Sequence, residues 1–426
     1  MVETAAAPPL IPVKELVMIT KTQGVCSSCL LAFLLSAVPV QAADNIGDAI
    51  AGGEFGFNLR YRFEFVDQDG FSQDANASTL RTRLNYKTAI WNKWSFFIEA
   101  DNVTELIFDD FNSGSGTSSA DRSIYPVVAD PNGTEINQAW INYAFTDKAG
   151  FKLGRQRILL DNQRFVGGVG WRQNEQTYDA ISISAKSGGK GNFFYAFVDN
   201  VNRIFGDDVA AGDHEQDTHL VNFTWPVAEK LKLGLYYYAI DNKDLASFST
   251  QTAGLRLSGK HTLSESKFNW GLEWADQSDN ANNTVDYSAN YLRLDAGLAL
   301  EKVSLSAGYE VLEGDDSRAG ASFRTPLATL HAFNGWADQF LGTPNDGLED
   351  FFLGIAGKTA GYGWKLVWHD FAAESGGRDF GQELDASVSR KLTDRLGLLL
   401  KGAFFDADSP SFRDTTKVWL MLTANF

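Results

Sequence analysis

Basic residues recur at every second position in two stretches near the start of the sequence. FNLRYRFE carries Arg60 and Arg62, and TLRTRLNYK carries Arg81, Arg83 and Lys87. Alternate residues of a β-strand face the same side, so each set lies on one face. A guanidinium group matches the geometry of a carboxylate. If the two stretches are neighbouring strands, they form a cationic wall suited to an acidic solute.

Arg256 with Lys260, and Arg293, extend this pattern later in the chain. Acidic residues fall on the same faces, however, and an ion-paired wall without anion preference is the alternative explanation. The acidic residues concerned are Glu64, Glu99, Asp101, Glu273, Asp295, Glu310, Glu383 and Asp385.

Residues suited to catalysis are few. The five histidines are His214, His219, His261, His331 and His369. His214 and His219 lie in HEQDTH, which is one residue too long for the zinc-protease spacing His-Glu-x-x-His. No Gly-x-Ser-x-Gly nucleophile motif occurs. We therefore expect neither an enzyme nor a cofactor, and a barrel-type phospholipase or protease is the less favoured alternative.

Alternation of apolar and polar residues defines the elements that carry these side chains. The hairpin from Tyr291 to Val311 places Leu292 and Leu294 on one face and Arg293 on the other. Eighteen segments of this kind start near Phe55, Thr79, Trp94, Glu135, Gly150, Thr177, Gly191, Asp217, Lys230, Gln251, Ser266, Asp286, Lys302, Glu349, Gly361, Gly381, Arg395 and Thr416.

The connections between these segments alternate in length. Short turns follow the even-numbered segments, and longer Asp/Gly/Ser-rich loops follow the odd-numbered ones, the longest at about 104–134 and 313–348. Short periplasmic turns and long extracellular loops are typical of outer-membrane barrels. The sequence therefore predicts an all-β fold, a transmembrane antiparallel β-barrel of about 18 strands.

Composition and the final strand agree with a barrel. Only 10 Pro and 3 Met accompany 39 Gly and 13% aromatic residues, and the mean hydropathy of −0.21 disfavours a helical membrane protein. TTKVWLMLTANF ends in Phe426 on the apolar face, like the assembly signal of outer-membrane proteins. We expect the barrel assembly machinery and outer-membrane lipid as partners.

The N-terminus predicts export. An apolar run from Leu30 to Val40 follows Lys21 and ends in a small-residue cleavage site after Ala42. Residues 1–42 are therefore expected to be an over-long gene start plus a signal peptide beginning at Met18, and residues 43–426 a single barrel domain. Both cysteines lie in the first part, so no redox or metal role is expected of them.

The net charge of −17 is concentrated in the predicted loops. Acidic loops bind divalent cations or are simply solvated, and Ca²⁺ shared with lipopolysaccharide is a candidate ligand. This sign of charge disfavours nucleic acid as a partner.

Two long blocks carry a family resemblance. KLGRQRILLDNQRFVGGVGWRQNEQTYDA (152–180) and TPLATLHAFNGWADQFLGTPNDGLED (325–350) resemble signature blocks of the alginate export family of outer-membrane porins. The resemblance implies an eighteen-stranded barrel with an electropositive constriction that passes a polyuronate outward, and loops that gate it. It adds four pore-lining candidates to the basic residues above: Arg155, Arg157, Arg164 and Arg172.

Two of these arginines depart from strict alternation. Arg155 and Arg157 share the parity of Leu153, so they reach the lumen only if a bulge resets the register. In the second block, Leu330, Phe333, Trp336 and Phe340 give an extracellular loop an unusual amount of apolar area. We expect this loop to plug or gate the barrel, and a docking loop is the alternative.

The sequence thus predicts a monomeric channel in the outer membrane of a Gram-negative bacterium. Its expected solute is an anionic polysaccharide such as alginate, or another acidic solute, moved outward. A general or substrate-specific porin for uptake of small acidic solutes is the alternative.

Overall fold

The computed structural model describes residues 43–187 and 191–426. The predicted start at Met18, the signal peptide with cleavage after Ala42, and both cysteines lie outside the described residues. No described helix is long and apolar enough to cross a bilayer.

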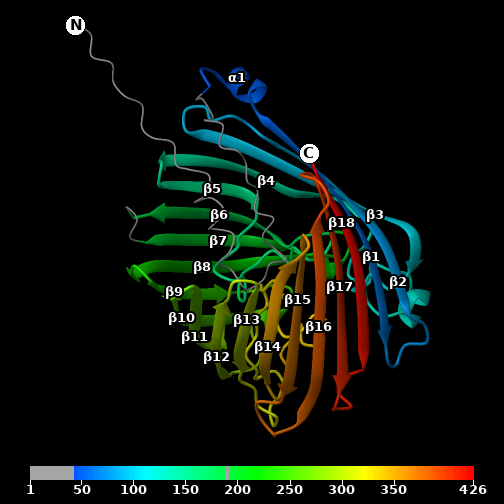
Figure 1. The fold of residues 1–426 in the computed structure, drawn as a ribbon. Helices are drawn as coiled ribbons and strands as arrows, with labels where there is room; N and C mark the ends of the chain where they lie inside the picture. Colours follow the sequence, from blue (N-terminus) through cyan, green and yellow to red (C-terminus); the bar gives the residue numbers. More distant parts are fainter. Residues whose placement is uncertain (1–42, 188–190) are drawn as a thin grey trace.

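One antiparallel sheet dominates the structure (Figure 1). Its strands are β1 (Glu54–Gln68), β2 (Ala75–Lys87), β3 (Trp94–Asp110), β4 (Gly133–Thr146), β5 (Ala149–Gln156), β6 (Thr177–Lys186), β7 (Asn192–Asn202), β8 (Asp213–Ala228), β9 (Leu231–Ile240), β10 (Thr250–Leu263), β11 (Ser266–Asp279), β12 (Ser288–Ala299), β13 (Val303–Leu312), β14 (Leu348–Thr359), β15 (Tyr362–Ala372), β16 (Asp379–Lys391), β17 (Leu396–Ala407) and β18 (Thr415–Asn425). The helical elements are α1 (Ile46–Ala51) and the short 3₁₀ turns η2 (Ala120–Ile124), η3 (Ala210–Gly212) and η4 (Ala246–Phe248).

The sheet closes on itself. Each strand pairs with its neighbours in sequence, and β1 also pairs with β18, with Phe63 opposite Leu420. Closure gives the backbone amides of every strand a partner, which a bilayer core demands. The predicted class, an 18-stranded antiparallel barrel, is confirmed, and every strand begins within four residues of its predicted start.

Alternation divides each strand between two environments. In the β12–β13 hairpin Leu294 lies opposite Tyr309 on the outer face, whereas Arg293 lies opposite Glu310 in the interior. Leu294 is 44% exposed and Glu310 is fully buried. The apolar face that the sequence predicted therefore surrounds the barrel, and the polar face lines its lumen. Trp419 follows the inward parity and is fully buried in the interior.

The connections form two unlike ends. We call the end with α1 and the C-terminus the short-turn end, and the other the long-loop end (Figure 1). The connection predicted at 104–134 is shorter, 111–132, because β3 continues to Asp110. The second long loop occupies 313–347, as predicted, and a third, 157–176, joins β5 to β6.

Two of these connections, the β5–β6 segment (157–176) and the β13–β14 segment (313–347), fold into the lumen and contact one another. The Gly167 amide donates to the Leu327 carbonyl at 2.8 Å, and the Thr329 amide donates to the Gln163 carbonyl at 3.0 Å. Phe165 of the first segment packs on Phe323 of the second. The two segments thus fill the middle of the barrel as one body.

Candidate functional site: the lumen and its inward segments

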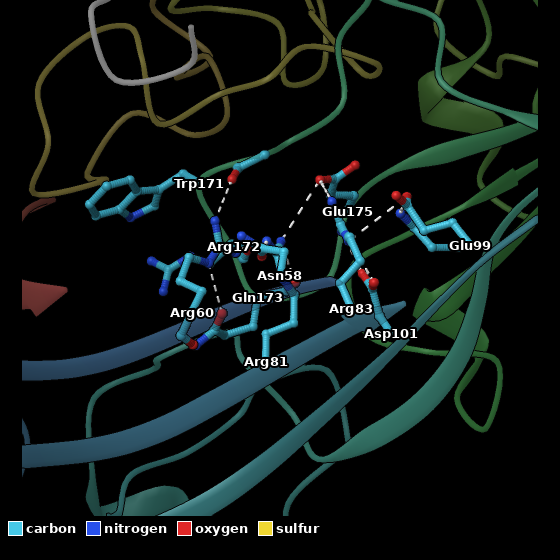
Figure 2. Close-up of polar contacts among 12 residues, drawn as sticks. Asn58, Arg60, Arg81, Arg83, Glu99, Asp101, Trp171, Arg172, Gln173 and Glu175 are labelled. Carbon is cyan, nitrogen blue, oxygen red and sulfur yellow. Dashed lines mark hydrogen bonds and ion pairs between the residues drawn. The ribbon is translucent and has the colours of Figure 1, made fainter. Parts of the chain in front are cut away.

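The predicted arginine wall exists on β1 and β2, but the β5–β6 segment covers it (Figure 2). Arg60 lies opposite Arg81 in the β1–β2 register. Arg60 donates to the Gln173 side chain at 2.9 Å and to the Gly170 carbonyl at 3.0 Å. Arg62 is paired with Asp130 at 3.0 Å. These guanidinium groups therefore hold protein oxygens in place of a bound anion.

Arg83 is the most densely paired member of the wall (Figure 2). It forms a two-pronged ion pair with Asp101, at 2.6 and 2.5 Å, and a further contact with Glu175 at 2.6 Å. Arg157 shares Glu175 with it and also contacts Glu99 at 2.6 Å. Burial alone would raise the pKa of Glu175, but Arg157 and Arg83 outweigh burial and hold that pKa well below its usual range.

Arg81 and Lys87 are less tightly held. Arg81 donates to Asn58 at 2.7 Å and approaches Glu175 only to 3.8 Å. Lys87 ends β2 at the short-turn end and is exposed. The alternative explanation raised from sequence, that lumen acids pair with these arginines, therefore describes Arg62 and Arg83, and only loosely Arg81.

Arg164 and Arg172 attach the β5–β6 segment to its surroundings. Arg164 contacts Glu310 of the wall at 2.7 Å and donates to the side-chain amide oxygen of Asn334 in the other segment at 2.9 Å. Arg172 contacts Glu64 of β1 at 3.0 Å and Asp338 of the β13–β14 segment at 3.1 Å. Both arginines are buried. Arg164 links a wall strand to the second segment through an ion pair and a hydrogen bond, and Arg172 does so through two ion pairs.

Arg155 lies on the outer face, which contradicts its expected position in the lumen. It pairs in register with Asp179 while Leu153 pairs with Ile181, and no bulge separates the two pairs. Leu153 and Ile181 are 46% and 40% exposed on the outside. Two hydrogen bonds to Asp179, at 2.9 and 3.0 Å, neutralise the guanidinium there. Alternation alone predicted this orientation correctly.

Arg256 and Arg293 occupy the far wall. Arg293 contacts Glu310 at 3.3 Å and lies 5.5 Å from the ring of Phe333. Arg256 approaches its nearest carboxylate, Glu273, only to 3.8 Å. Arg293 therefore helps to hold the segment, whereas Arg256 faces the open part of the lumen.

The β13–β14 segment is anchored through the residues that the sequence singled out. Trp336 and Phe340 are buried, and Leu330 and Phe333 are half-buried. No helix forms among the described residues here, because Leu330, Asn334, Gly335 and Asp338 have positive φ and break the segment into turns. Phe340 packs in a group with Phe371, Phe380, Phe405 and Phe412.

A backbone cradle fixes the tip of this segment to β16. The amides of Trp336 and Ala337 both donate to the Glu383 carboxylate, the second at 2.8 Å. Gly335 precedes them at φ +82°, and a Cβ there would lie 2.4 Å from Glu383 Oε2. Only glycine fits this close approach.

A caged lysine, missed in the sequence, completes the anchor. Lys401 Nζ lies 3.7 Å from the ring of Trp336, 4.1 Å from that of Trp171 and 5.3 Å from that of Trp419. It also contacts His331 Nε2 at 2.6 Å. A desolvated cation over an aromatic face gains about 2 kcal/mol. The cue was available, since Lys401 is the one charged residue in LGLLLKGAFF.

His331 joins this lysine to an acid. Its Nδ1 lies 2.7 Å from Asp338 Oδ1. Burial, together with the Lys401 ammonium, lowers the pKa of His331 to about 3. The ring is therefore neutral near pH 7, with Nε2 accepting from Lys401 and Nδ1–H donating to Asp338.

Open space remains on the short-turn side of the two segments. A cavity of about 800 Å³ lies there, and the two segments close its inner side with Asn162, Gln163, Ala332 and Phe333. Six cations line it against the three carboxylates Asp161, Glu229 and Asp295. The cations are Lys148, Lys186, Lys230, Lys232, Arg256 and Lys260. Of the predicted basic residues, only Arg256 and Lys260 line this space.

Among residues 43–187 and 191–426, no group of three or more His, Cys, Asp or Glu side chains is arranged to hold a metal ion. The expected binding of Ca²⁺ at acidic loops stays a prediction.

The chain is similar to known proteins in sequence and in structure. The sequence model described as alginate export matches residues 53–335. No curated protein sequence matches the chain. Two solved porins share the fold: OccAB4 of Acinetobacter baumannii (TM-score 0.70, 12% identity, 91% of this chain and 99% of that chain) and OccK9 (OpdG) of Pseudomonas aeruginosa (0.68, 15%, 89% and 100%). OpdK of Pseudomonas aeruginosa, solved with vanillate, is similar at TM-score 0.65 and 11% identity over 88% of this chain and 98% of that chain.

Proposed function

Because the chain belongs to the alginate export family, we propose that it is an outer-membrane channel, not an enzyme, that passes an anionic polysaccharide of the polyuronate type. The long-loop end faces the cell exterior, following the usual topology of such barrels. Export is the direction that the family supports. The protein acts as a monomer among outer-membrane lipid and lipopolysaccharide, after assembly directed by Phe426.

The observation that carries this proposal is the excess of cations around the open cavity. Its five lysines form no ion pair with a described carboxylate, and all are exposed to the lumen. A uronate about 6 Å from one ammonium in water gains about 0.7 kcal/mol, by Coulomb's law. Several such weak contacts lower the barrier for a polyanion without trapping it, as conduction requires.

The arginine wall has a different function in this proposal. Arg62 and Arg83 of the wall form ion pairs with Asp130 and Asp101, and Arg172 of the β5–β6 segment forms one with Glu64. They set the position of the β5–β6 segment and thereby the width of the lumen. Anion preference is assigned to the lysines.

The β13–β14 segment is the gate in this proposal. Together with the β5–β6 segment it fills the middle of the barrel, so a polymer passes only when the segment moves. Leu330, Phe333, Trp336 and Phe340 are the apolar contacts that hold it in place. The Glu383 cradle and the Lys401 cage are its polar anchors.

The test is the reversal potential of the refolded barrel in a planar bilayer under a salt gradient. We expect anion preference and block by oligomannuronate. Replacing Lys230, Lys232 and Lys260 together by Gln should weaken both. The matched control replaces Lys302, Lys358 and Lys391, which carry the same charge at the same end but do not line the cavity. Cation preference in the unmodified protein would reject the proposal.

Uptake of small acidic solutes is the second candidate. It is favoured by the fold shared with OpdK, which was solved with the aryl carboxylate vanillate. Block by vanillate but not by oligomannuronate would favour this candidate over the polymer.

A further inference from the structure

The long-loop end is acidic, whereas the cavity on the short-turn side is lined by more cations than carboxylates. The nine connections of the long-loop end contain eighteen carboxylates against ten Lys and Arg when Asp161, which lines the cavity, is left out. Asp69, Asp74, Asp207, Asp208 and Asp316 are among the exposed ones. The cavity at the other end is lined by six cations against three carboxylates.

The lysines at the short-turn end face the lumen. Lys232 follows the inward parity of Tyr236 on β9, and Lys260 that of Arg256 on β10. Lys230 lies in the β8–β9 turn, and its carbonyl accepts from the Lys260 amide at 3.0 Å. Three neighbouring strand ends therefore present cations to one patch of the cavity rim.

From this axial gradient we propose that the channel is sided: a polyanion is captured at the short-turn mouth and is disfavoured at the long-loop mouth. The inference rests on the proposed function, because it concerns the same solute. It adds the mouth at which the polymer binds and the lysines that bind it, Lys230, Lys232 and Lys260.

Fixed charges in a passive channel cannot drive net transport. The charge gradient instead changes how readily a polyanion enters the channel from each mouth. Low-dielectric walls focus the field of a charged cleft and raise local counter-ion concentration by about 10-fold or more. Exposed loop carboxylates are screened over about 8–10 Å at physiological salt, yet they still lower the polyanion concentration at the outer mouth. A polymer that has left the channel is thus hindered from returning.

The experiment is one-sided block of single channels of known orientation. Orientation is set with Ser72→Cys in the exposed β1–β2 loop, labelled with biotin and located by streptavidin. We expect oligomannuronate to block at about 10-fold lower concentration from the short-turn side than from the long-loop side. Lys230→Gln with Lys232→Gln and Lys260→Gln should abolish the difference.

The matched variant neutralises three exposed loop acids, Asp207→Asn, Asp208→Asn and Asp316→Asn, and should make block from the long-loop side stronger. Equal block from both sides with anion preference retained would overturn the sidedness and leave the proposed function intact. Cation preference without block would overturn both.

Binding in detergent gives a measurement that needs no open pore. Calorimetry with oligomannuronate should show affinity lowered in the triple lysine variant and kept in the triple aspartate variant. Affinity unaffected by loss of the lysines would overturn capture at this mouth.

Discussion

Replacing Arg83 by Gln tests whether the arginine wall is structural or conducting. Arg83 is buried, and its two-pronged contact with Asp101 and its contact with Glu175 would both be lost. Removing one partner of a buried ion pair costs about 3–5 kcal/mol. Arg157 continues to hold Glu175, so we expect the low end, a loss of about 3 kcal/mol in the free energy of unfolding.

The assay is urea-induced unfolding of the barrel in lipid vesicles. The exposed pair Lys391–Asp394 supplies the control, because Lys391→Gln removes an ion pair that water already screens and should leave stability unchanged. Adding Asp101→Asn to Arg83→Gln should restore part of the loss, since it removes the unpaired buried carboxylate.

The same variant is then measured for ion preference. Arg83 does not line the open cavity, so the reversal potential should stay at its unmodified value. A stability loss below about 1 kcal/mol, at the level of an exposed pair, combined with a clear loss of anion preference, would show that Arg83 serves conduction and refute this division of roles.

Three further outcomes follow from the anchors and the outer face. His331 is held neutral with a pKa of about 3, whereas a released histidine titrates near about 6.5. Acidification below that pH therefore favours release by up to about 1.4 kcal/mol per pH unit; open probability should rise as the pH falls, and His331→Gln should remove this dependence. Gly335→Ala should loosen the gate, because its Cβ would meet Glu383; limited proteolysis within 313–347 would detect it, and unchanged cleavage would count against the anchor. Arg155→Gln should change neither conductance nor ion preference, since Arg155 lies outside the lumen; altered selectivity would place it inside.

The barrel was predictable because its constraint is local. Each strand separates lipid from lumen, so the pattern of a few residues, as in Leu292-Arg293-Leu294, determines both the element and its two faces. The same rule gave the correct outward position of Arg155. It failed for Arg157, which follows the end of β5 and contacts Glu99 and Glu175 in the lumen. The wrong prediction for Arg155 came from the family resemblance, which implied a position in the lumen although alternation placed the residue outside.

The contacts within the lumen were not predictable, because their partners are distant in sequence. Arg164 and Glu310 are 146 residues apart, and Lys401 and His331 are 70 apart. The sequence of the β5–β6 segment does not itself show that this segment turns inward. Its backbone is held by the β13–β14 segment, through the Leu327 carbonyl and the Thr329 amide.

Arginine and lysine occupy different parts of the lumen: arginines hold the inward segments, and lysines surround the open cavity. Arginine's planar fork suits fixed contacts with several oxygens, and Arg83, Arg164 and Arg172 each join two parts of the structure. Lysine is a strongly hydrated point charge that makes weak, exchangeable contacts, and lysines dominate the cations around the open cavity. A solute that must leave as readily as it arrives needs the weak, exchangeable contacts that lysine makes. In the proposed function, anion conduction is therefore assigned to the lysine rim, and the arginines are assigned the position of the β5–β6 segment.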